Sequence, residues 1–116
     1  MFKSLECVSV PVTDLEKAFD FYVSMGLEES WRIEREGGAV LVGLKFPNKK
    51  SSELVLNYKG AVPEMEVEIA VGSVHHTVKK LKKNPDVKII VEPFETESGN
   101  VAVFEAPDGN VYVIVD

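Results

Sequence analysis

Several residues that can contact a small molecule lie in short apolar segments of the sequence. Glu53 begins the segment Glu-Leu-Val-Leu-Asn-Tyr, and Glu66 and Glu68 alternate with apolar residues in Glu-Val-Glu-Ile-Ala-Val. Cys7 begins a similar alternation, Cys-Val-Ser-Val-Pro-Val. Carboxylates in a partly dry cleft favour a cationic or hydrogen-bonding ligand, and a glutamate there can also act as a general acid or base on a carbonyl substrate.

The remaining residues with reactive side chains are expected to be structural. His75 and His76 are adjacent in a segment with helical spacing, and neighbouring helical residues point in different directions, so we expect both to be solvent-facing or partly packed. Cys7 is the only cysteine, which excludes an intrachain disulfide and a multi-cysteine zinc site. No His or Asn is placed to activate its thiol, so a small buried residue is expected.

The elements that position these residues begin with a strand over residues 7–12, where apolar and polar positions alternate. Thr13 is predicted to cap the following helix, with Glu16 completing a capping box, and Gly26 to end it. Turn-forming residues then separate three further strands, expected at residues 28–34, 38–46 and 53–58.

The second half repeats this order. Residues 66–71 align with residues 7–12, and Ser73 is predicted to cap a helix that ends at Asn84-Pro85. Strands follow at residues 88–91, 100–105 and 110–115, with a Pro-Asp-Gly turn at 107–109. The repeat predicts an α+β protein of two βαβββ modules, residues 1–60 and 61–116, in one structural domain with Lys59–Pro63 as the linker.

Each predicted module has one amphipathic helix, which covers one face of its sheet and leaves the other face for a different use. Two such sheets placed edge to edge form a curled mixed sheet around a cleft, which suits a small molecule. The residues expected to line this cleft are Cys7, Glu53, Asn57, Glu66, Glu68 and Val113.

Composition narrows the possible functions. The chain has 116 residues, 13 Lys and Arg against 19 Asp and Glu, and a net charge of -6. A negative chain is a poor binder of phosphate backbones, so no nucleic-acid partner is expected. No apolar stretch approaches the ~20 residues that span a bilayer, and the first residues lack the apolar core of a signal peptide. We expect no membrane partner and a cytoplasmic location.

The order of these motifs resembles the glyoxalase and bleomycin-resistance proteins, also called the vicinal oxygen chelate superfamily. The segment Leu5–Tyr22 is similar to that family's first strand and helix, Glu53–Tyr58 to its fourth strand, and Ala106–Asn110 to the turn before its last strand. The resemblance covers nearly the whole chain. It implies a glyoxalase-like fold and a homodimer.

Metal-using members of that family place His, Gln or Glu ligands on the first, fourth, fifth and eighth strands. The resemblance assigns those positions to Cys7, Glu53, Glu66 and Val113, of which only Glu53 is the expected type. A thiolate with two carboxylates and no imidazole suits no common metal well. We therefore expect a metal-free small-molecule binding protein with an acidic cleft and no cofactor. A lyase, isomerase or dioxygenase with altered metal ligands, and a non-catalytic dimeric scaffold, remain as alternatives.

Overall fold

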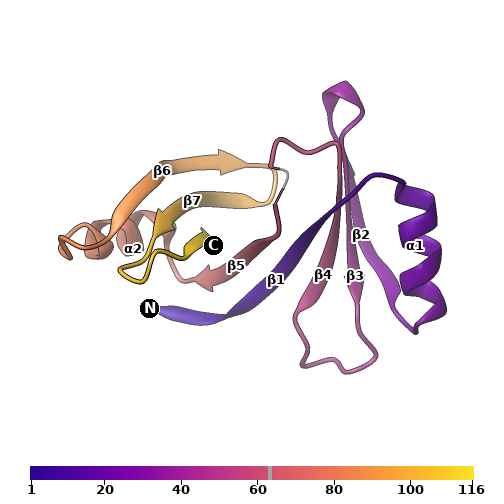
Figure 1. Cartoon of the computed structure of the whole chain (residues 1–116). Helices are drawn as coiled ribbons and strands as arrows, with labels where there is room; N and C mark the ends of the chain where they lie inside the picture. Colours follow the sequence, from indigo (N-terminus) through magenta and orange to yellow (C-terminus); the bar gives the residue numbers. More distant parts are fainter. Residues whose placement is uncertain (63) are drawn as a thin grey trace. The chain divides into compact units, whose positions relative to one another are not determined.

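The computed structural model describes residues 1–62 and 64–116, and these residues form two α-helices, eight strands and one short 3-10 helix (Figure 1). The order β-α-β-β-β occurs twice, which confirms the predicted α+β class and the two βαβββ modules. Neither helix is long and apolar enough to cross a membrane. The elements are β1 (Phe2–Val12), α1 (Leu15–Ser24), β2 (Glu28–Glu34), η1 (Glu36–Gly38), β3 (Val40–Lys45), β4 (Glu53–Tyr58), β5 (Glu66–Val71), α2 (Val74–Leu81), β6 (Lys88–Thr96), β7 (Gly99–Glu105) and β8 (Val111–Val115).

The chain divides into two compact units. One contains residues 7–66, and the other contains residues 1–6 together with residues 67–116. The first six residues fall in the second unit because β1 begins at Phe2, five residues before the predicted strand start. Of the predicted linker, Pro63 lies outside the described residues.

In the unit of residues 7–66, four strands lie in the order β2-β3-β4-β1. β1 and β4 pair in parallel, whereas β2 with β3 and β3 with β4 pair antiparallel. One face of these strands packs against α1, and its fully or nearly buried residues are Leu27, Val42, Leu44 and Leu56. From α1, Leu15, Ala18, Phe19 and Tyr22 pack against this cluster, at the spacing of three and four that the sequence showed.

The start of α1 corrects one prediction. The N-cap is Asp14 and not Thr13: Asp14 has extended backbone angles, and its Oδ1 accepts a hydrogen bond from the Lys17 backbone N–H at 3.0 Å. Aspartate and threonine both cap helices well, so the choice depends on which residue leaves the strand geometry last. The helix ends as predicted near Gly26, whose φ of 102° lies in the left-handed region.

In the second unit, β5, β8, β7 and β6 lie in that order, with β5 and β8 parallel and the other neighbours antiparallel. The buried cluster against α2 is formed by Val71, Val74, Val78, Ala102, Phe104 and Ile114. Phe2, from the start of β1, stacks on Phe104 with ring centroids 6.0 Å apart.

The start of α2 is capped from two elements. Ser73 accepts from the His76 backbone N–H at 3.2 Å, as predicted, and Asp116 Oδ2 accepts from the Val74 backbone N–H at 2.9 Å. Asp116 Oδ1 also accepts from the Asn100 backbone N–H at 3.0 Å. These hydrogen bonds, first from Val74 and then from Asn100, hold the pKa of the Asp116 carboxyl below its usual value of 3.8. At its other end α2 stops at Leu81, before the predicted Asn84-Pro85.

Candidate ligand-binding site

The predicted cleft residues of the first unit lie on one face of its sheet. In the parallel β1–β4 pair, Cys7 is opposite Glu53 and Pro11 is opposite Asn57. Alternate residues of a strand point to opposite faces, and Leu54 and Leu56 pack on the side of α1. Cys7, Glu53 and Asn57 therefore share the face away from α1, as the sequence predicted.

Trp31 orients the Glu53 carboxylate from two strands away. Its indole Nε1 donates a hydrogen bond to Glu53 Oε1 at 2.7 Å. Trp31 is the register partner of Gly43 on β3, and Gly43 is opposite Val55 on β4, so the indole crosses β3 at a residue without a side chain. A Cβ at Gly43 would overlap the indole Nε1. Gly43 thus permits a contact that no motif in the sequence predicts.

Asn57 contributes a buried polar atom with no partner. Its side chain is 8% exposed, and its Oδ1 makes no hydrogen bond with any residue of the described chain. A Cβ at Gly60 would overlap the Asn57 amide group, so this side chain is closely packed there. A buried acceptor without a donor costs about 1–3 kcal/mol. This acceptor can be satisfied by a donor from outside the described residues, from water or a bound molecule as well as from protein.

The second unit holds two of the predicted residues. Glu68 on β5 is opposite Val113 on β8, and both lie on the face away from α2, because their neighbours Ile69 and Ile114 pack against that helix. Val113 is buried, with 8% of its surface exposed. Glu66 is the first residue of β5 and ends the other unit.

The residues at the metal positions assigned by the resemblance do not fit a divalent ion. Val113 has no donor atom, and of the four positions only Glu53 carries the residue type expected of a ligand. Among residues 1–62 and 64–116, no group of three or more His, Cys, Asp and Glu side chains could hold a metal ion. His75 and His76 are both exposed on α2, as predicted.

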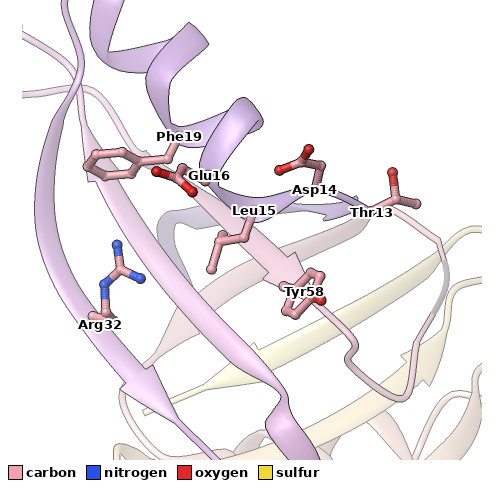
Figure 2. A pocket seen from close by; sticks show the side chains of 7 residues that line it. All are labelled: Thr13, Asp14, Leu15, Glu16, Phe19, Arg32 and Tyr58. Carbon is pink, nitrogen blue, oxygen red and sulfur yellow. The ribbon is translucent and has the colours of Figure 1, made fainter.

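A second feature was not predicted from the sequence: a cavity of about 570 Å³ on the α1 side of the first unit (Figure 2). It is lined by the first turn of α1, by Arg32 of β2 and by Tyr58 of β4. Arg32 and Tyr58 are opposite Val42 and Val40 of β3, which places both side chains on the helix face. The register of three strands brings these residues together, and no local pattern could have revealed that.

Comparison with known proteins gives a family and a fold. The family model "Glyoxalase/Bleomycin resistance protein/Dioxygenase superfamily" matches residues 4–114. No curated protein matches the sequence.

Several solved structures are similar. A hypothetical protein, BH1468 from Bacillus halodurans C-125, has a TM-score of 0.78 at 20% identity, covering 97% of this chain and 92% of that one. Methylmalonyl-CoA epimerase from Mycobacterium tuberculosis has a TM-score of 0.80 at 14% identity, covering 98% and 87%. A variant of the Streptomyces coelicolor epimerase, in complex with 2-nitronate-propionyl-CoA, has a TM-score of 0.78 at 17% identity, covering 99% and 97%. At these identities the likeness concerns the fold. With the family model matching almost the whole sequence, the chain belongs to the glyoxalase/bleomycin resistance protein/dioxygenase superfamily.

Proposed function

We propose that the protein binds a small organic cation on the sheet face that carries Glu53 and Asn57, without a metal and without a cofactor. The observation that carries this proposal is the unpartnered carbonyl oxygen of buried Asn57, on the same face as a carboxylate that is already oriented.

Both groups accept hydrogen bonds. Glu53 uses Oε1 for the Trp31 indole, and its Oε2 makes no hydrogen bond within the described chain, so it can accept from an ammonium group. Asn57 lies four residues further along β4, about 13 Å at the usual rise of a strand. A ligand with donors at both ends of an apolar or flexible body matches this spacing.

The comparisons support a small molecule of some kind as the ligand. The epimerase from Streptomyces coelicolor was solved in complex with 2-nitronate-propionyl-CoA, so a protein of this fold binds a small organic molecule. The acidic residues of this chain favour a different, positively charged class.

The proposal is tested with three probes that differ in charge and in the number of donors: spermidine, hexylamine and hexanoate. Spermidine is expected to raise the Tm of the wild-type protein by several degrees, because a ligand at 100 times its Kd stabilises a protein by about 2.7 kcal/mol. Hexylamine should act more weakly, since it cannot reach Asn57 with a second donor. Hexanoate should have no effect. Calorimetric titration then gives each Kd.

Three variants assign the effect to residues. Glu53→Gln keeps the shape and an acceptor for Trp31 but removes the charge, and is expected to weaken both amines at least about tenfold. Asn57→Leu should weaken spermidine and leave hexylamine unchanged. Glu36→Gln, in the exposed η1 segment, is the matched control.

Equal binding by wild type and Glu53→Gln would overturn the proposal. Stoichiometric binding of a divalent metal that Glu53→Gln abolishes would favour a metal-dependent lyase, isomerase or dioxygenase instead. If neither the probes nor any metal bind, the proposal is wrong and a non-catalytic dimeric scaffold is the remaining hypothesis.

A further inference from the structure

The cavity beside α1 lies on the sheet face opposite Glu53 and Asn57, so the function proposed above leaves it without a role. Its volume of about 570 Å³ is within the range of small-molecule sites. Its apolar surface comes from Leu15, Phe19 and Tyr58, all partly buried. Figure 2 shows Leu15 and Tyr58 between the Arg32 guanidinium on one side and Thr13 on the other.

Arg32 is held in place but keeps free donors. Its Nε and Nη2 donate to Glu29 Oε1 at 3.3 and 2.9 Å, and its Cζ lies 5.6 Å from the centre of the Phe19 ring. These contacts fix the plane of the guanidinium. The two N–H groups on Nη1 make no hydrogen bond with a residue of the described chain and can bind a carboxylate.

Glu16 supplies a negative charge to the same cavity. It lies in the first turn of α1, and within residues 1–62 and 64–116 it forms neither a hydrogen bond nor an ion pair. In particular, Glu16 and Arg32 line one cavity without pairing with each other. Asp14 also lines the cavity, but its Oδ1 is already used by the Lys17 N–H.

This arrangement excludes the simplest ligands. A plain carboxylate that bound Arg32 would be repelled by Glu16 and Asp14, whereas a plain amine that bound Glu16 would leave the Nη1 donors of Arg32 without an acceptor. A molecule that carries both charges close together satisfies both side chains. Its apolar part would then cover Leu15, Phe19 and Tyr58 and remove their exposed surface from water.

We propose that this cavity binds a free α-amino acid with an apolar or aromatic side chain. The carboxylate pairs with Arg32, the ammonium pairs with Glu16, and the side chain lies against Leu15, Phe19 and Tyr58. The site is independent of the cation-binding face, which lies on the other side of the sheet.

The test uses L-phenylalanine and L-leucine, with phenethylamine and phenylpropionate as analogues that each lack one charge. Binding to the wild-type protein is measured by calorimetry and by NMR shifts of the amides of residues 13–19. An amino acid is expected to bind, and each analogue to bind at least about tenfold more weakly.

Variants separate this site from the other. Glu16→Gln and Arg32→Gln should each weaken the amino acid about tenfold, whereas Glu53→Gln and the control Glu36→Gln should leave it unchanged. Because Arg32→Gln also removes the pairing with Glu29, Glu16→Gln serves as the variant that leaves the fold intact, and unfolding curves are recorded for both. Three results would overturn the proposal. Neither amino acid binds, phenethylamine binds as tightly as phenylalanine, or Glu53→Gln abolishes amino-acid binding. Loss of binding in Glu53→Gln would place the ligand on the other face of the sheet. If only spermidine fails to bind, the cation-binding proposal is wrong and the amino-acid proposal is unaffected.

Discussion

At the scale of single residues, one glycine determines how the Glu53 carboxylate is presented. The indole of Trp31 lies across Gly43 and donates to Glu53 Oε1, so three strands contribute to one hydrogen bond. A side chain at position 43 would occupy the place of the indole. The usual view of glycine as a flexible residue does not apply here, because what matters is the missing Cβ atom.

We expect Gly43→Ala to displace the indole and to lower the free energy of unfolding by about 1–3 kcal/mol, the usual cost of inserting a methyl group into a packed region. Trp31 is the only tryptophan, so its fluorescence reports on this contact alone. The emission should shift to longer wavelength as the ring becomes more exposed. The matched control is Gly72→Ala, since a Cβ at Gly72 meets nothing within 4 Å. An unchanged emission spectrum in Gly43→Ala would show that the indole does not depend on Gly43.

The sequence predicted some features of the site and not others. Alternation along each strand was enough to put Cys7, Glu53 and Asn57 on one face, because side chains of a strand alternate with period two. It could not show that Trp31 hydrogen-bonds Glu53, since that contact depends on the register of β2 with β3. The missing partner of Asn57 Oδ1 is likewise visible only in three dimensions.

At the scale of elements, strand limits were predicted best where apolar alternation is bounded by turn residues. The limits of β2, β4 and β5 are those expected from the sequence. β6 runs on to Thr96, past the predicted end at Val91, although Pro93 lies within it. A proline is tolerated on an edge strand, and β6 is the edge strand of its unit.

Asp116 connects three elements of the second unit, and its effect on stability should depend on pH. Its pKa is lowered in the folded protein, so the ionised form stabilises the fold above the unfolded pKa near 3.8, and this contribution is lost as the pH falls through the lower folded value. Asp116→Ala should therefore cost about 1 kcal/mol near neutral pH, the usual cost of removing a side chain that caps a helix. Chemical denaturation of both proteins across the acid range measures the difference, which should shrink below the pKa. A difference that stays constant with pH would assign it to packing and not to charge.

At the scale of the whole molecule, the resemblance implies association of two copies, and we propose that β6 takes part. Ile90, Val91 and Phe94 of this edge strand are 47%, 39% and 46% exposed. Irregular register with β7 near Val91 and Phe94 makes backbone pairing with another strand unfavourable, so contact through side chains is expected.

Sedimentation analysis of the wild-type protein should give the mass of two chains. Combining Ile90→Lys with Phe94→Lys is expected to give one chain, because two buried charges would face the partner. Phe21→Lys, on α1 where the phenyl ring is 56% exposed, is the control and should not change the mass. A wild-type protein that sediments as one chain at all concentrations would refute the expectation of a dimer.

The division of β1 between the two units has a consequence for protein synthesis. Residues 1–6 leave the ribosome before residues 7–66, yet they belong to the unit formed by residues 67–116, where Phe2 stacks on Phe104. Contacts between distant parts of a chain carry the largest entropy of loop closure and form late. Contacts within residues 7–66 can therefore form earlier in synthesis than the stacking of Phe2 on Phe104, which requires β7 to have been translated.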